Sequence, residues 1–289
     1  MKKILIAGAS GVLGREVLSQ IHQSGQYWVR AHIRDETKRE EILPYCDEIV
    51  LADARYPEQL SGICDDIDIV FSTIGMSISM FAVEPGNFVD VDFKGNLNLL
   101  EEAKKAKVPR FVYTSIYASE SSPRLMQGWS QEMFAQNLMH TNISHTVIKP
   151  VGMFTGLNDL IIMAKAGFLI TPGSGKYKTN PIHPQDLAQF CVEQLESGPS
   201  VVEVGGPEVH TRNEVMDTVA EAMDVKLTVN IPEWIVRPGL LLIRLFSKNL
   251  YDKLSYFTYI TTHDMVAPAY GKHTFEEYLK ERADTKMPA

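Results

Sequence analysis

The sequence predicts an α/β protein built on a doubly wound, mostly parallel sheet. Two observations lead to this prediction. Short apolar segments alternate with amphipathic ones through the first 150 residues, and a glycine-rich turn at 8–14 joins the first apolar segment to the first amphipathic one. Such alternation is typical of parallel strands joined by crossover helices, whose ligands bind at the carboxyl ends of the strands.

Hydrophobic periodicity and turn residues place the elements of this first half. The first expected helix begins at Val12 and ends at Ser24-Gly25, and a long helix runs from Val89 to Ala106 before Pro109. The expected strands are 4–7, 28–33, 48–51, 68–71, 110–114 and 145–149.

The periodicity weakens after Pro150, so residues 151–289 are expected to form a smaller α+β lobe. Some of its strands and helices are expected to return to the core of the first half. The expected elements are an apolar helix, a helix from Asp186, a strand at 201–204, a helix opened by the capping box Thr211–Glu214, and amphipathic helices within 231–280.

The composition limits the function. The chain has 289 residues, 45% of them hydrophobic, and a formal net charge of −8. It therefore lacks the basic surface with which nucleic-acid-binding proteins neutralise phosphates. Its three cysteines form no C-x-x-C pair, a usage typical of a reducing compartment. Its eight histidines show no metal-ligand spacing. We expect a cytoplasmic protein without a nucleic-acid partner, a membrane span or a metal site.

The turn at 8–14 predicts a phosphate site. Gly8, Gly11 and Gly14 follow a strand and open a helix. Glycine lets a pyrophosphate approach the backbone, and the helix N-terminus presents free N–H groups and the positive end of its dipole. The spacing differs from the commoner G-x-G-x-x-G pattern. The alternative is a turn whose glycines serve only close packing of the strand against the helix.

The end of the second strand distinguishes NADP from NAD. Arg34 stands there, about 20 residues beyond the glycines, and its guanidinium suits a 2′-phosphate, which favours NADP(H). Asp35 follows directly and leaves NAD(H) possible if the strand ends later. The alternative for these charges, with Lys38 and Arg39, is an ordinary solvated loop.

The next two strands also end in groups that suit a dinucleotide. Asp53, followed by Ala54, can accept a hydrogen bond from an adenine amino group, although it could instead cap the next helix. The fourth strand ends in Ser72, Thr73 and Gly75, small residues against which a ribose and nicotinamide fit.

Taken together, these features resemble the atypical short-chain dehydrogenase/reductase family, especially its NmrA-like and isoflavone-reductase-like members and the complex I accessory subunit of the same fold. The segments that carry the resemblance are GASGVLG at 8–14, GNLNLLEEAKKAKVPRFVYTS at 95–115, TVIKP at 146–150, NPIHPQDLA at 180–188, VGGPE at 204–208 and DMVAPAYG at 264–271. The resemblance implies a Rossmann NAD(P)(H)-binding domain at 1–150 and a C-terminal substrate lobe at 151–289.

The resemblance also assigns roles. The expected cofactor-binding residues are Gly8, Ser10, Gly11, Val12, Leu13 and Gly14 at the pyrophosphate, Arg34 at the 2′-phosphate, Asp53 and Ala54 at the adenine, and Ser72, Thr73, Gly75 and Ser115 toward the ribose and nicotinamide.

One part of the family pattern is missing. Family members that oxidise alcohols or reduce carbonyls usually use a Tyr-x-x-x-Lys pair, in which the lysine lowers the pKa of the tyrosine. None of the eleven tyrosines is followed by lysine at this spacing, and the expected positions carry Gln127 and Gln131. Ile116 aligns with the usual serine or threonine. The remaining proton donors are Ser115, Tyr117, Lys149 or water.

Two functions remain open. The first is an NADP(H)-dependent oxidoreductase that delivers hydride to a polarised C=C or C=O of a small organic molecule. The second is a non-enzymatic redox sensor or assembly or regulatory factor whose C-terminal lobe binds a protein or lipid-like partner. Two further polar pairs, His183 with Asp186 and His263 with Asp264, either serve acid/base chemistry or occupy ordinary turns and caps, which we favour.

Overall fold

The computed structural model describes residues 1–122 and 124–283. It divides into two compact units. Unit 1 comprises Met1–Met76, Pro85–Lys149 and Leu187–Glu203, and unit 2 comprises Ser77–Glu84, Pro150–Asp186 and the described residues from Val204 onward. The chain therefore crosses between the units several times.

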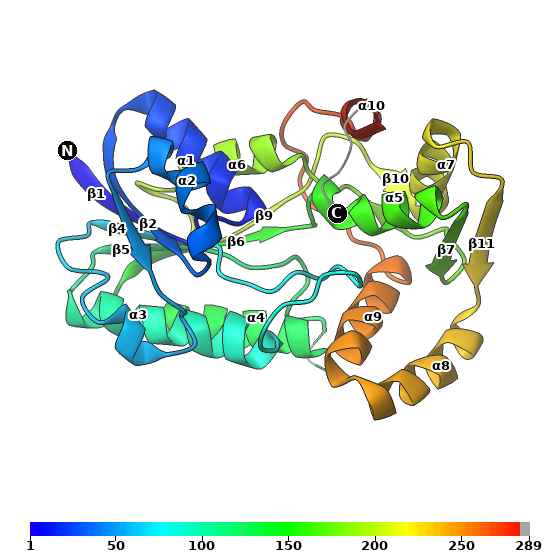
Figure 1. Cartoon of the computed structure of the whole chain (residues 1–289), viewed down its shortest axis with the longest axis horizontal. Helices are drawn as coiled ribbons and strands as arrows, with labels where there is room; N and C mark the ends of the chain where they lie inside the picture. The colour runs from blue at the N-terminus through cyan, green and yellow to red at the C-terminus, as the bar shows by residue number, and fades with distance from the viewer. Residues whose placement is uncertain (123, 284–289) are drawn as a thin grey trace. The chain divides into compact units, whose positions relative to one another are not determined.

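Unit 1 is organised around a seven-stranded parallel sheet, which confirms the expected Rossmann fold class (Figure 1). In spatial order the strands are β3 (Glu48–Leu51), β2 (Tyr27–Ile33), β1 (Lys2–Ala7), β4 (Ile69–Ser72), β5 (Arg110–Thr114), β6 (Ser144–Pro150) and β9 (Val201–Val204). The order reverses between β1 and β4, and ligands of such sheets bind at this switch point, beyond the carboxyl ends of the strands.

Helices cover both faces of this sheet. The helices α1 (Val12–Ser24) and α6 (Pro184–Glu193) cover one face, and α3 (Asn96–Lys105) and α4 (Met126–Met139) cover the other (Figure 1). The helix expected at 89–106 is regular only from Asn96, because Val89–Gly95 forms a π-helix. The smaller helical segments are Glu36–Lys38, α2 (Arg39–Ile42), Leu43–Tyr45 and Pro57–Leu60.

The core of unit 1 lies between the sheet and α3 and α4. Tyr113 and Phe111 of β5 are fully buried, and the ring of Phe134 from α4 packs on both of them. The strands of a parallel sheet are covered on both faces, so apolar residues run continuously along β1 rather than alternating.

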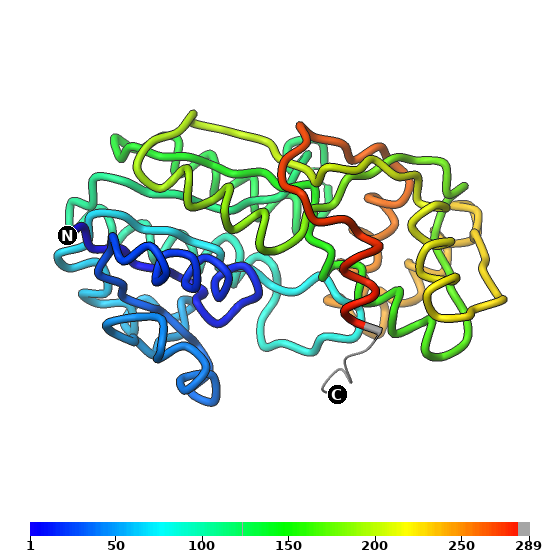
Figure 2. Tube along the Cα trace, turned by 90° about the horizontal axis from the view of Figure 1, so that it is seen from above, coloured from blue at the N-terminus to red at the C-terminus, as the bar shows by residue number. Residues whose placement is uncertain are grey.

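Unit 2 contains two short sheets and five α-helices among its described residues. The strands β7 (Phe168–Pro172) and β11 (Leu227–Ile231) pair in parallel and run side by side in Figure 1, and Figure 2 shows the same chain from above. The strand β8 (Lys178–Thr179) pairs with β10 (His210–Thr211) in antiparallel fashion. The helices are α5 (Asn158–Lys165), α7 (Arg212–Ala222), α8 (Glu233–Phe246), α9 (Lys248–Thr261) and α10 (Phe275–Ala283), with a short 3₁₀ helix at Phe154–Leu157. The expected capping box, Thr211 with Glu214, is confirmed.

Segment 77–84 belongs to unit 2 although it leaves β4 of unit 1. Two buried charges hold it. Asp159 accepts hydrogen bonds from Ser79 Oγ at 2.5 Å and Met80 N at 2.8 Å, and Lys253 donates to the carbonyl oxygens of Ser79 and Ala82 at 2.9 and 2.7 Å. Within the described part of the chain, no helix is both long and apolar enough to cross a bilayer.

Candidate cofactor site

The glycine turn connects β1 to α1. Gly8 has φ of +84°, a conformation that favours glycine, and Gly11 N donates to its carbonyl oxygen at 3.0 Å. A Cβ added at Gly14 would lie 2.3 Å from that same oxygen, so only glycine fits there. Close packing, the alternative interpretation, therefore accounts for Gly8 and Gly14.

Gly11 differs from the other two glycines. Its φ is −69°, which any residue adopts, and the nearest atom to an added Cβ would be 3.3 Å away. An added Cβ would thus be in close contact with the Gly8 carbonyl oxygen, a smaller clash than at Gly14, and it would also stand in the way of a group approaching the turn. The bare backbone at Gly11 fits a bound pyrophosphate.

The N-terminus of α1 is suited to an anion. Gly11 is the N-cap residue, it supplies no side-chain cap, and the first turn holds no acidic residue. The N–H groups at the start of a helix have no intrahelical acceptor, and the helix dipole is positive there. The predicted residues Val12 and Leu13 lie in this first turn, and Ser10 precedes it.

Arg34 directly follows β2, which ends at Ile33, and its side chain is exposed. Asp35 accepts hydrogen bonds from N and Oγ1 of Thr37 at 3.0 and 2.7 Å, which lower the pKa of its carboxyl and cap the 3₁₀ helix at 36–38. The strand thus ends directly before Arg34, the residue expected at the 2′-phosphate, and the Asp35 carboxylate is already hydrogen-bonded to Thr37.

Asp53 is held by an arginine that the sequence analysis did not identify. Arg55 Nη2 lies 2.6 Å from Oδ2 of Asp53 and Arg55 Nε lies 3.0 Å from Oδ1. These hydrogen bonds from Arg55 lower the pKa of the Asp53 carboxyl, although partial burial opposes the shift. Asp53 also accepts from the backbone N–H of Arg55, while Ala54 beside it is buried. The Asp-x-Arg spacing is the sequence signal for this pair.

At the end of β4 the backbone is accessible at Gly75, whereas the side chain of Ser72 is already hydrogen-bonded. Gly75 is exposed and Thr73 is half-buried, with Thr73 N donating to the carbonyl oxygen of Ala7 at 3.0 Å. Ser72 is buried and donates from Oγ to Oδ1 of Asn96 at 2.6 Å. A ligand at this edge would therefore meet backbone at 73–75 before it met the hydroxyl of Ser72.

Two glutamines occupy the positions expected for the acid/base pair. Gln127 and Gln131 lie one turn apart on α4, and only 4% and 5% of their surfaces are exposed. Gln131 donates from Nε2 to Oδ1 of Asp92 at 2.6 Å and accepts a hydrogen bond from the hydroxyl of Tyr113. Asp92 Oδ2 accepts from Met76 N at 3.1 Å. Gln131 thus joins β5, the π-helix and the loop after β4.

Lys149, at the end of β6, is neutralised by two carboxylates. Its Nζ lies 2.7 Å from Oε2 of Glu120 and 3.1 Å from Oε2 of Glu132. Burial alone would lower the pKa of Lys149, but the two glutamates outweigh it and the pKa is raised. The ammonium therefore keeps its proton at neutral pH. Ser115 is buried at the end of β5 and Tyr117 is half-buried two residues later.

A family model described as NAD(P)H-binding matches residues 8–198, which include every predicted cofactor-binding residue. The chain belongs to this NAD(P)H-binding family. The match begins at the first glycine of the turn and covers β2 to β6, five of the seven strands of the sheet of unit 1. The cofactor class predicted from the sequence is therefore confirmed.

Curated relatives of this NAD(P)H-binding protein include assembly factors. It is 24% identical over 293 residues to the photosystem II assembly factor Ycf39 of Trieres chinensis, covering 97% of this chain and 88% of that protein. It is 25% identical over 200 residues to Ycf39 of Synechocystis sp., covering 67% of this chain and 58% of that protein.

Solved structures with the same fold include enzymes. A nucleoside-diphosphate-sugar epimerase from Staphylococcus aureus has a TM-score of 0.72 at 14% identity, covering 97% of this chain and 100% of that one. An NADPH-dependent quinone oxidoreductase from Escherichia coli, crystallised with NADPH, has a TM-score of 0.71 at 17% identity, covering 96% of this chain and 99% of that one. These likenesses confirm the fold of the atypical short-chain family.

The other polar pairs of the NAD(P)H-binding protein lie in unit 2. Asp186 accepts from the backbone N–H groups of Lys272 and His273 at 2.9 and 3.0 Å, and His273 Nδ1 lies 2.7 Å from its other oxygen. Asp186 thus fastens the loop at 271–273. Asp264 accepts from Lys178 N at 2.7 Å. Both aspartates have structural partners of the kind that the turn interpretation predicted.

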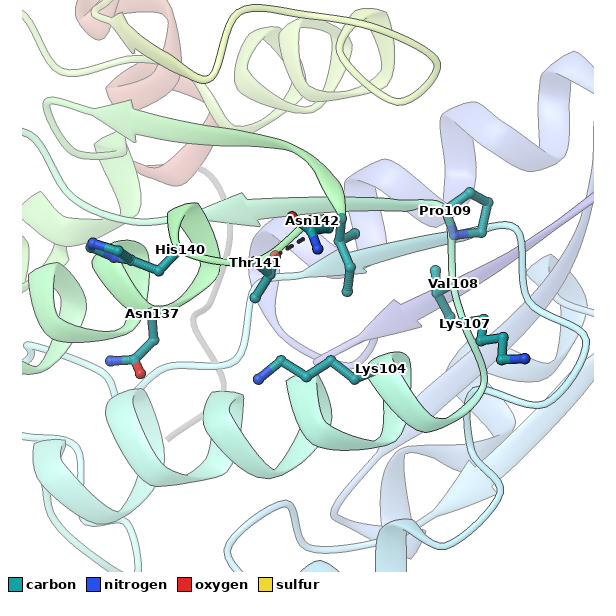
Figure 3. Close-up of a pocket in the computed structure, with 9 residues that line it drawn as sticks. Lys104, Lys107, Val108, Pro109, Asn137, His140, Thr141 and Asn142 are labelled. Atoms are coloured by element: carbon teal, nitrogen blue, oxygen red, sulfur yellow. Dashed lines mark hydrogen bonds between the residues drawn. The ribbon is translucent and has the colours of Figure 1, made fainter.

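A shallow depression lies at the opposite edge of the sheet from the glycine turn (Figure 3). It borders the loops that precede β5 and β6, at the amino ends of these strands. Its lining residues are Lys104, Lys107, Val108, Pro109, Asn137, His140, Thr141, Asn142 and Ile143. None of them is a predicted cofactor-binding residue, and the depression is separate from the cofactor edge.

Proposed function

We propose that this protein binds NADP(H) and acts as a dinucleotide-dependent binding factor for a protein partner, rather than as an alcohol or carbonyl oxidoreductase. The observation that carries the proposal is the pair of buried amides at Gln127 and Gln131. An amide has no proton to exchange at accessible pH. Gln131 is already hydrogen-bonded to Asp92 and Tyr113.

The neighbouring groups do not replace the missing acid. Lys149 is paired with Glu120 and Glu132, so releasing a proton would leave two carboxylates without their cation. Burial raises the pKa of Tyr113 well above its usual value, so this hydroxyl stays protonated. General acid catalysis needs a pKa near the working pH, and neither group has one.

The choice of NADP(H) rests on Arg34. An exposed guanidinium directly after β2 can form charge-assisted hydrogen bonds with a 2′-phosphate, whereas Asp35 is occupied by Thr37. The bound dinucleotide would supply hydride chemistry if an acceptor reached it. The chain itself supplies the cradle of Gly11 and the α1 N-terminus.

The proposed partner class rests on the relatives. The Ycf39 proteins are named photosystem II assembly factors, and their similarity to this chain extends beyond the glycine turn. A role in which the NADP(H)-bound protein binds another protein needs no proton donor at the nicotinamide, which agrees with Gln127 and Gln131.

Two measurements test this function. Nicotinamide fluorescence should report saturable NADPH binding that is weakened in the Arg34→Ala variant but not in Arg39→Ala. Affinity capture by the immobilised protein should then recover a partner with NADPH present and lose it when NADPH is omitted or when Arg34→Ala is used. Equal capture with and without NADPH would contradict the proposal.

A second candidate is hydride transfer to an acceptor that needs no protein acid, such as a quinone or a polarised C=C. Ser115 favours it, because this buried hydroxyl ends β5 at the cofactor edge, and the quinone oxidoreductase from Escherichia coli shares the fold. Hydride from NADPH would reduce the acceptor, and the proton would come from water, directly or through the hydroxyl of Ser115 or Tyr117. Stereospecific loss of deuterium from C4-deuterated NADPH, with an acceptor present, would establish this candidate over the first.

A further inference from the structure

The helix α8 of unit 2 exposes an apolar face. None of its residues is buried, and 74% of Trp234, 78% of Leu245 and 89% of Phe246 are exposed. At 3.6 residues per turn, the exposed apolar residues form one stripe about 140° wide. The stripe consists of Trp234, Ile235, Pro238, Leu241, Leu242, Leu245 and Phe246.

This stripe is not the side with which α8 packs on its own unit. The half-buried residues Val236, Leu240 and Ile243 lie on the opposite side of the helix. The helix α9 follows after Ser247 and contacts α8, so the two helices form a hairpin within unit 2 (Figure 1). A contiguous exposed apolar stripe of seven residues marks an interaction site.

Cations border one edge of the stripe. Arg237 and Arg244 lie two turns apart on the same side of the helix, and Lys248 follows at the start of α9. Glu233 is the acidic residue of α8, and its carboxylate lies 3.1 Å from Arg237 Nη2. Arg244 lies over the ring of Tyr251, 5.5 Å from its centroid. The edge is therefore cationic in a chain whose net charge is −8.

We propose that α8 is a membrane-surface anchor, which lies in the plane of an anionic bilayer with the stripe in the headgroup region. Tryptophan, leucine and phenylalanine on one face with arginines beside them are the features of interfacial helices. Arginines can rest their stems on the apolar zone while their guanidinium groups contact anionic headgroups. At 14 residues α8 is too short to span a bilayer.

The charges argue against an antiparallel pair of copies as the occupant. In an antiparallel two-fold pairing of α8 stripes, each arginine edge would face the same edge of the other copy. Like charges at that position repel. An anionic lipid surface instead complements the edge along its whole length. This role is independent of the proposed cofactor function.

Vesicle flotation tests the anchor. The full-length protein should float with phosphatidylglycerol vesicles and stay unbound with phosphatidylcholine vesicles. Leu242→Glu and Leu245→Glu should each reduce binding about tenfold or more, the factor produced by about 1.4 kcal/mol. The matched control is Val209→Glu, which places the same charge at another exposed apolar site of unit 2. Arg237→Gln with Arg244→Gln should weaken the binding to anionic vesicles.

Tryptophan emission supplies a second readout. The chain has three tryptophans, and anionic vesicles should shift the emission to the blue in the unmodified protein but not in Trp234→Phe. Unchanged far-UV circular dichroism and melting temperature would show that each variant is folded. Failure of the unmodified protein to bind phosphatidylglycerol vesicles would overturn the proposal. So would a dimer in light scattering that Leu242→Glu converts to a monomer, because the stripe would then be covered by a second copy.

Discussion

Gln131 donates a hydrogen bond to Asp92 over 2.6 Å, and both side chains are buried. At the position where the family pattern implies a lysine, this contact gives the Gln131 amide a structural role. Through Asp92 the amide supports the loop after β4, and through Tyr113 it is tied to β5. Where the resemblance implies a lysine that polarises a tyrosine, this chain has an amide that holds a loop.

Replacing Gln131 by leucine should destabilise unit 1. The substitution leaves Asp92 and the Tyr113 hydroxyl without this partner in the interior, and an unsatisfied buried polar group costs about 1–3 kcal/mol. We expect the free energy of unfolding to fall by at least about 2 kcal/mol in urea titrations. The control is Gln136→Leu on the exposed side of the same helix, expected within about 0.5 kcal/mol of wild type. Equal losses in the two variants would refute the role of Gln131.

Gly14 and Gly11 of the turn should respond differently to alanine. In Gly14→Ala the new Cβ meets the Gly8 carbonyl oxygen at 2.3 Å, and overpacking of this kind costs about 1–3 kcal/mol. Gly11→Ala should cost less stability than Gly14→Ala, because its Cβ would lie 3.3 Å from the same oxygen, and it should weaken NADPH binding. Gly239→Ala, in the interior of α8 with nothing within 4 Å, serves as the control and should be neutral or slightly stabilising. Normal NADPH binding by Gly11→Ala would argue against the turn as the pyrophosphate site.

Arg34 should set the preference between NADPH and NADH. A hydrogen bond to a charged group contributes about 1.5–3 kcal/mol, so Arg34→Ala should weaken NADPH binding about 10-fold to 100-fold and leave NADH binding nearly unchanged. Fluorescence titrations with both cofactors measure the ratio. Arg39→Ala removes a nearby arginine that pairs with Glu36 and provides the comparison. An NADPH:NADH ratio in Arg34→Ala equal to that of wild type would exclude contact with the 2′-phosphate.

Lys149 should make stability depend on pH in a defined direction. Burial raises the pKa of Glu120 and Glu132, but hydrogen bonds, including those from Lys149, outweigh it and lower both values below 4.5. A lowered carboxyl pKa adds stability above the unfolded pKa, and this stability is lost as the pH falls through the folded pKa. The pKa of Lys149 is raised, so the stability that its ammonium contributes is lost only when the pH rises through that pKa, in the alkaline range.

The Lys149→Met variant should therefore lose about 2 kcal/mol of stability at neutral pH. The loss should shrink as the pH falls below about 4.5, because the two carboxyls then take up protons in the variant. Urea midpoints measured across this pH range check the prediction, with Lys104→Met, at an exposed pair with Glu101, as the control. A loss that is the same at acidic and neutral pH would show that the ion pairs do not cause it.

Much of the sheet could be predicted from the sequence, because most of its strands are short apolar runs ended by glycine, proline or a polar residue. The strands expected at 48–51 and 110–114 have these same bounds in the structure, and β4 is shifted by one residue. The site residues at strand ends followed from the same rule. The family match then confirmed the cofactor class, while the individual contacts of those residues stay predictions.

The remaining features depend on contacts between distant segments. Gln131, Asp92 and Tyr113 come from three elements, and no local pattern indicates that an amide at 131 reaches a carboxylate at 92. The pairing of β7 with β11 joins strands more than fifty residues apart. The π-helical turn at 89–95 also has no periodicity signal that distinguishes it from an ordinary helix start.

One titration with NADPH tests both parts of the proposal, cofactor binding and the absence of carbonyl reduction. Nicotinamide fluorescence and the absorbance of the reduced cofactor are followed together, before and after a pool of aldehydes and ketones is added. We expect a saturable fluorescence change with about one site per chain, and an absorbance that stays constant after the pool is added. The absence of saturable binding would contradict the cofactor site. Steady, protein-dependent loss of absorbance with a carbonyl compound would contradict the conclusion that Gln127 and Gln131 have replaced the acid/base pair.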